Sequence, residues 1–309
     1  MRIIAALIFV LLLMLPVSVL AQSFGGVGTR AEGMGGAFVA VADDASAIYW
    51  NPAGIATGAT FDLQISKGRE SGLFIGAALP VLGAGYYKTR DVIRLPTVSS
   101  PPDRQNGGSG EIPIRTLTTT NVGVTVVQTV VPGLVLGTTA RVVRGAIDGL
   151  NSATDPGPRT TVDLDAGAMV SAWDLRFGLT GRNLRAPTFQ TEGGMVRMSR
   201  QVRVGAALAP RALPTGVHGP FTLAIDADLT TTSDAMGNRR TASAGGEYWL
   251  VKGLIGARTG VRWSTLGDSQ RAFSGGITVR LPRSLYIDGQ MTKEDESENQ
   301  WHIAARVTF

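Results

Sequence analysis

The most constraining feature of this sequence is a long series of short segments in which apolar and polar residues alternate. In the last segment, residues 300–309, Trp301, Ile303 and Phe309 fall on one face, whereas His302 and Arg306 fall on the other. Successive side chains of a β-strand point to opposite sides, so the alternation predicts strands with one apolar and one polar face. From residue 57 onward we therefore expect an all-β protein.

The alternation predicts about fourteen antiparallel strands. Short turns, such as Trp173–Asp174, alternate with longer polar loops, such as Arg94–Ile112. A soluble sandwich also has many short strands, but this alternation of connections is typical of a transmembrane β-barrel. The predicted strands are 59–67, 72–79, 83–93, 113–130, 134–148, 159–172, 175–185, 196–209, 220–230, 241–250, 253–264, 271–281, 284–293 and 300–309.

Charged residues near the middle of the predicted strands favour the barrel over the sandwich. They fall on the polar faces, and the apolar faces carry almost none. A polar interior can hold such charges, whereas a face turned to lipid must be free of them. We expect them to form a structural network of ion pairs in the lumen rather than to bind substrate. They are Arg141, Asp163, Asp165, Arg176, Arg182, Arg203, Asp226, Asp228, Glu247, Arg258, Arg262, Arg280, Asp288 and Arg306.

The first residues predict export. Met1–Ala21 contains one basic residue, Arg2, then an apolar run, and ends in small residues. This pattern is typical of a secretory signal peptide, with cleavage expected between Ala21 and Gln22, and the run is short for a membrane anchor. The sequence has no cysteine, which excludes a disulfide framework and thiolate chemistry.

The stretch Arg30–Ile55 does not alternate, and we expect it to form a compact plug that the strands surround. Asp43 or Asp44 is predicted to cap a short helix, which Pro52 and Gly54 would end. Asn51 is the residue on which we place most weight, because its side chain can cap local backbone where Pro52 stiffens the turn. The apolar side chains of the stretch could line a path for a hydrophobic ligand or simply pack the plug against the wall. These side chains are Met34, Phe38, Ile48 and Trp50.

The blocks Gly33–Ala40, Asp43–Ala47 and Trp50–Gly54 resemble the N-terminal hatch of the FadL/TodX outer-membrane transporter superfamily, which includes short PorV/PorQ-like barrels. After the signal peptide expected at 1–21, the resemblance implies a hatch at 22–56 and a fourteen-stranded outer-membrane barrel at 57–309. It also implies passive passage of long-chain fatty acids or other hydrophobic compounds. Phe309 resembles the C-terminal signal that the barrel-assembly machinery recognises.

The chain is shorter than the fatty-acid transporters, and its longest predicted loop is rich in Pro, Gly and Ser. In its short length, the chain is closer to the PorV-like branch. The alternative implied is therefore a secretion-system component or a non-transporting envelope scaffold. Expected partners are outer-membrane lipid, the assembly machinery and either a hydrophobic ligand or secretion-system proteins. Whether the plug is a gate or a filler stays open.

No pattern predicts catalysis or a cofactor. The two histidines, His218 and His302, lie far apart and have no nearby cluster of metal ligands. The glycines between Gly26 and Gly36 follow no strand and do not have the spacing of a phosphate-binding loop. The net charge of +5 is mild and not clustered, which argues against nucleic-acid binding. We expect a protein that is not an enzyme and that binds no metal.

Overall fold

The computed structural model describes residues 26–69, 72–94, 114–148, 157–191, 194–210, 221–234, 237–267, 269–295 and 299–309. The predicted signal peptide at 1–21, its cleavage point, His218 and most of the loop at 94–112 lie outside the described residues. None of the described helices has the length and hydrophobicity needed to cross a membrane.

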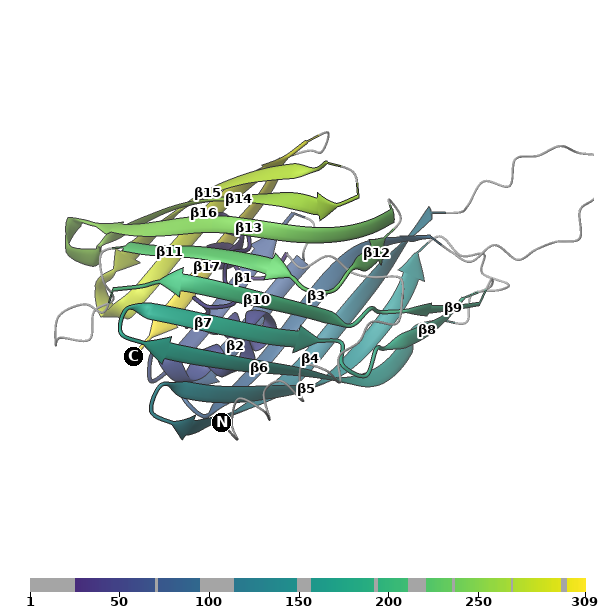
Figure 1. Ribbon diagram of the computed structural model, residues 1–309, viewed down its shortest axis with the longest axis horizontal. Helices are drawn as coiled ribbons and strands as arrows, with labels where there is room; N and C mark the ends of the chain where they lie inside the picture. The colour runs from purple at the N-terminus through teal and green to yellow at the C-terminus, as the bar shows by residue number, and fades with distance from the viewer. Residues whose placement is uncertain are drawn as a thin grey trace, which may run out of the picture.

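Fourteen antiparallel strands close into one barrel (Figure 1). The ring closes where β1 pairs with β17 and where β11 pairs with β13. The strands of the wall are β1 (Asp62–Gly68), β2 (Gly72–Leu79), β3 (Leu82–Arg94), β4 (Ile114–Val131), β5 (Leu134–Asp148), β6 (Arg159–Ala172), β7 (Leu175–Arg182), β10 (Gln201–Leu208), β11 (Phe221–Asp228), β13 (Gly237–Leu250), β14 (Ile255–Leu266), β15 (Arg271–Leu281), β16 (Leu285–Glu294) and β17 (Gln300–Thr308).

These strands confirm the prediction of a fourteen-stranded barrel, and most ends agree within a few residues. One predicted strand, 196–209, is wrong in extent, because its first residues belong to a separate hairpin. That hairpin is formed by β8 (Thr188–Thr191) and β9 (Gly194–Arg197), and the barrel strand β10 starts only at Gln201. A further short strand, β12 (Thr232–Asp234), pairs with the start of β13. Strands this short carry too few residues for alternation to be visible.

Alternation along the strands separates an apolar outside from a polar inside. On β1, Leu63 and Ile65 are exposed, whereas Gln64 and Ser66 are buried. The exposed faces of the other strands are also dominated by Val, Leu, Ile and Phe. A wall with this distribution has an outer surface suited to lipid and an interior that must satisfy its polar groups by internal contacts.

Residues 26–58, here called the N-terminal segment, form no strand. They contain helix α2 (Thr29–Gly33), helix α3 (Ala47–Trp50) and the 3-10 helix η1 (Pro52–Thr57). Helix α2 contacts β14 to β17, α3 contacts β3 and β4, and η1 contacts β4, β5 and β6. These helices lie behind the front strands in Figure 1.

The predicted helix cap at Asp43 or Asp44 is wrong. The helix begins at Ala47, and its cap residue, Ser46, makes no side-chain capping bond. The carboxylate of Asp44 instead accepts hydrogen bonds from the amide and hydroxyl of Ser46, and Asp43 pairs with Arg30. Asp44 therefore bonds locally to the residue that precedes the helix, whereas Asp43 makes a contact across the N-terminal segment that local spacing does not reveal.

Candidate functional site

Asn51 is the polar centre of the N-terminal segment. Its side-chain amide donates to the carbonyl oxygens of Val39 at 2.8 Å and of Ala168 on β6 at 3.2 Å. Its Oδ1 accepts from the amide of Ala53 at 3.2 Å, which caps η1. One fully buried side chain thus links two parts of the segment to each other and to the wall.

The four apolar side chains singled out in the segment are completely enclosed. Met34, Phe38, Ile48 and Trp50 each expose at most 1% of their surface. Phe38 packs edge-on against Trp50 with 6.1 Å between ring centres, and the Trp50 indole donates to the carbonyl of Val27. In this conformation, none of the four lines an open path through the barrel.

Glycines on the inner face of the wall accommodate the backbone of the N-terminal segment. A Cβ atom built on Gly260 of β14 would lie 2.1 Å from the carbonyl carbon of Met34, and one on Gly178 of β7 would lie 2.4 Å from the carbonyl oxygen of Val39. Any larger residue at these positions would displace the segment or the wall. Equivalent close approaches occur at Gly137 and Gly245, and at Gly167 the side chain of Asn51 comes closest.

Ion pairs surround the start of the segment. The guanidinium of Arg30 binds Asp43 at 2.5 Å and Glu247 of β13 at 2.6 Å. Burial alone would lower the pKa of Arg30, but Asp43, Glu247 and Asp44 together hold that pKa above its ordinary value. Arg306 of β17 contributes a contact with Asp44 at 3.4 Å. Arg30 therefore forms ion pairs both within the N-terminal segment and with the wall.

A second charged cluster lies inside the wall at β5, β6 and the end of β7. Arg141 binds Asp163, and its Nε lies 2.9 Å from Asp165. The same two acids accept hydrogen bonds from main-chain amides, Asp165 from Asn183 at 2.9 Å and Asp163 from Arg185 at 3.0 Å. The cluster thus fixes the chain where it leaves β7 and turns toward the β8–β9 hairpin.

Other predicted lumenal charges also contact the segment or one another. Asp226 of β11 accepts hydrogen bonds from the amides of Phe38 and Val39, and Arg203 lies 3.7 Å from the same carboxylate. Asp228 binds Thr241, and Arg262 lies near Glu294 and Glu32. The structure therefore provides an internal partner for each of these charges, and none of them is presented to an open channel.

Two features of the interior were not predicted. The guanidinium of Arg182 stacks over the ring of Tyr49, 3.6 Å from its centre. Phe189 of the β8–β9 hairpin packs with Ile93, Leu117 and Val143 from the inner wall. Alternation of buried and exposed residues stops at the end of β7, where Gly181, Arg182 and Asn183 are all buried. Asn183 adopts a positive φ of 55°, and the chain turns inward there.

The outer face carries a shallow apolar depression of about 710 Å³ over β10, β11, β13 and β14. Its lining includes the small residues Ala206, Ala244 and Gly246 and the larger Leu223 and Phe273. On the inner side of the wall, Gly245 and Gly260 touch Met34. The N-terminal segment is thus separated from the outer surface here by little more than the backbone of the wall.

The remaining predicted residues lie apart from this region. Phe309 is exposed on the outside of the wall, where it pairs with and stacks on Phe61. His302 is buried against Gln290 of β16. Within the part of the chain that the structure describes, no three His, Asp or Glu side chains are grouped as metal ligands.

A family model described as "F plasmid transfer operon, TraF, protein" matches residues 147–228, which is less than half of the chain. No curated protein matches the sequence. Among solved structures, the chain is similar to the CymD monoaromatic hydrocarbon channel, with a TM-score of 0.63, 13% identity and coverage of 94% of this chain and 99% of that one.

The Pseudomonas putida toluene transporter TodX gives a TM-score of 0.63 at 10% identity, over 93% of this chain and 99% of that one. A TodX deltaS2 mutant gives 0.60 at 9% identity, over 92% and 98%. Identities this low establish the fold alone, so the PorV/PorQ assignment stays a prediction. The chain therefore has a closed fourteen-stranded barrel whose fold is similar to that of the CymD and TodX channels.

Proposed function

We propose that this protein is an outer-membrane barrel through which hydrophobic compounds pass passively, and that the N-terminal segment is the plug that closes it. The observation that carries the proposal is the fold, which is shared over nearly the whole length of the chain with channels named for monoaromatic hydrocarbons and toluene. The apolar outer face supports placement in a membrane, because lipid tolerates few polar groups.

The outer depression supports a lateral route for the ligand. It is apolar, it opens toward the lipid side, and small residues occupy both faces of the wall behind it. Because the strands behind the depression are continuously paired, a lateral route needs both a shift of Met34 and a local opening between these strands. Since Met34 and Phe38 are enclosed in the present conformation, passage requires the plug to move.

A second candidate is a non-transporting envelope protein, which includes a secretion-system component. The complete packing of the segment against wall glycines and ion pairs favours this reading, because a permanent filler needs such contacts. The local match to a family named for a plasmid transfer operon also favours it. On either reading we expect signal-peptide export, lipid contact and recognition of Phe309 by the assembly machinery.

Uptake distinguishes the two candidates. Gram-negative cells that lack their own hydrophobic-compound transporters would express the full chain and receive labelled toluene or a labelled long-chain fatty acid. The transport proposal expects faster initial uptake than in cells with an empty vector, and no change for a hydrophilic sugar. Equal uptake of the hydrophobic compounds, with the barrel folded in the outer membrane, would favour the non-transporting reading.

A further inference from the structure

Several basic side chains point outward near the strand ends at the end of the barrel that carries most of the longer connections. Lys67 continues the exposed row of Leu63 and Ile65 on β1, and Arg144 continues the exposed face of β5 beyond Val142. On β3, Lys88 and Arg90 occupy alternate exposed positions, with buried Thr89 between them. These residues therefore lie on the outside of the barrel and not in its lumen.

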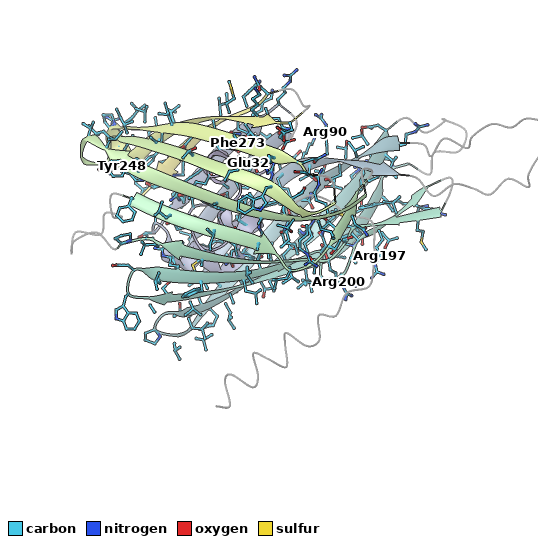
Figure 2. All side chains as sticks on the ribbon, turned by 45° about the horizontal axis from the view of Figure 1, so that its top comes forward. Glu32, Arg90, Arg197, Arg200, Tyr248 and Phe273 are labelled. Atoms are coloured by element: carbon cyan, nitrogen blue, oxygen red, sulfur yellow. The ribbon has the colours of Figure 1, made fainter. Side chains whose placement is uncertain are left out.

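The same feature continues round the wall. Lys293 follows exposed Met291 on β16, and Arg271 precedes exposed Phe273 on β15, to which Lys293 is paired. We call the six residues Lys67, Lys88, Arg90, Arg144, Arg271 and Lys293 the basic belt. In Figure 2, Arg90 lies toward the opposite end of the barrel from Tyr248.

The register places Lys293 and Arg271 near the level of Arg144 although the strands tilt. Paired residues lead from Arg144 through Thr120 to Lys88 on β3. Two strands further round, they lead from Lys67 on β1 through Ile303 to Gly289 on β16 and Ile277 on β15. Such a ladder of paired residues changes height as it goes round a barrel whose strands are inclined. Lys293 and Arg271 lie four and six residues beyond those ladder positions, toward the outer end, which offsets the change in height.

Charge on the belt has one dominant sign. Among side chains that the structure describes, the acids that continue the outward rows at this end are Asp148 and Asp295. Asp148 accepts a hydrogen bond from Thr118, and Asp295 accepts one from the amide of Arg271. The opposite end presents exposed aromatic residues on its outer face, including Trp173 and Tyr248. Exposed aromatic residues also lie beside the belt, at Phe273 and Trp301, so the aromatic residues do not distinguish the two ends.

We propose that the basic belt binds the phosphate groups of anionic lipid headgroups in the leaflet that surrounds this end of the barrel. Guanidinium and ammonium groups pair with phosphate by charge-assisted hydrogen bonds. The belt lies just beyond an apolar surface, which is the depth at which headgroups begin. The inference rests on the membrane placement in the proposed function but not on transport, so loss of uptake and loss of lipid binding are separate outcomes.

The test uses the full chain, folded and inserted into nanodiscs of phosphatidylcholine with a minor fraction of lipid A, a glycolipid that carries phosphate monoesters. Mass spectrometry of the repurified discs counts lipid A per barrel. Wild type is expected to enrich lipid A over its bulk fraction. The variant K88Q/R90Q/R144Q is expected to lose that enrichment by roughly tenfold or more, since each basic residue near an anionic surface strengthens binding severalfold.

A matched control, R115Q/R159Q/R239Q, removes three inward-facing charges from the same end and is expected to keep the enrichment. The charge-preserving variant K88R/R90K/R144K is also expected to keep it, which separates charge from folding. Heat-modifiable mobility in electrophoresis checks that each barrel is folded. Unchanged enrichment in K88Q/R90Q/R144Q, or an equal loss in the inward control, would overturn the proposal.

Discussion

The main-chain amide of Phe38 donates a hydrogen bond to Oδ2 of Asp226 at 2.8 Å. This bond joins the N-terminal segment to the carboxylate of a wall strand that lies far away in the sequence. The same oxygen accepts from Val39, so the backbone of the segment supplies the donors that water would supply in an open lumen. Segment and wall therefore satisfy each other, and any opening must replace these bonds.

Replacement of Asn51 by Ala is expected to loosen the plug. It removes the donors to Val39 and Ala168 and the acceptor for Ala53, and buried groups left without partners destabilise the fold. We expect the free energy of unfolding to fall by about 2–4 kcal/mol, measured by urea denaturation in lipid vesicles. Uptake of labelled fatty acid should change, while the barrel still assembles.

The exposed Asn299 provides the control for Asn51. Its replacement by Ala is expected to alter the free energy of unfolding by no more than about 0.5 kcal/mol. If the Asn51→Ala protein is as stable as this control and has wild-type uptake, Asn51 does not hold the N-terminal segment in place.

A methyl group at Gly260 is expected to push the N-terminal segment away from β14. The new Cβ would overlap the backbone of Met34, which has no room to retreat in the packed lumen. Limited trypsin digestion should then cleave the folded protein at Arg30 much faster than it cleaves wild type. The matched control is Gly289→Ala on β16, where an added Cβ meets nothing within 4 Å. Equal protection of Arg30 in the two variants would contradict the close fit.

Removal of Arg141 is expected to be strongly destabilising. Arg141→Leu would leave the buried carboxylate of Asp163 without its cation and Asp165 with the more distant Arg182 at 3.9 Å. Breaking such a buried ion pair costs about 3–5 kcal/mol. Because Asn can still accept from the amides of Asn183 and Arg185, the triple variant R141L/D163N/D165N should recover part of that loss. A single variant with wild-type stability in urea denaturation would show that the cluster does not fix the turn after β7.

Deletion of Phe309 is expected to reduce assembly rather than to unfold a barrel already made. The ring is exposed and the residue lies at the edge of the wall, so few interior contacts are lost. The amount of heat-modifiable folded protein in outer membranes should fall, whereas refolding from urea into lipid vesicles should proceed as in wild type. A normal amount of folded protein in outer membranes after the deletion would show that Phe309 is not the assembly signal.

The fold was predictable because the alternation of apolar and polar residues is a local property that can be seen in each strand by itself. Strands such as 72–79 and 159–172 have the predicted bounds, since an apolar outside and a polar inside impose period two over their whole length. The β8–β9 hairpin was missed because its strands are very short. Its position depends on Phe189 reaching the inner wall, a contact without a local signature.

The site was predictable only in outline. The sequence identifies Asn51 and the inward charges, but the pairing of Asp226 with the amide of Phe38 joins distant residues and leaves no spacing pattern. The wall glycines did carry a usable signal. Gly167, Gly178 and Gly260 occupy inward positions in the middle of alternating strands, where a side chain is expected. Their absence of a side chain indicates that another backbone approaches there.

The most direct test of the account is a cross-link that holds the plug in place. A Cβ on Gly85 of β3 would lie 3.8 Å from Cβ of Ile48 in α3, which suits a disulfide, and the protein has no cysteine of its own. In the variant I48C/G85C, we predict that labelled toluene uptake falls to the empty-vector level when the disulfide is formed and recovers after reduction. Undiminished uptake with the disulfide fully formed would contradict the claim that the N-terminal segment closes this barrel.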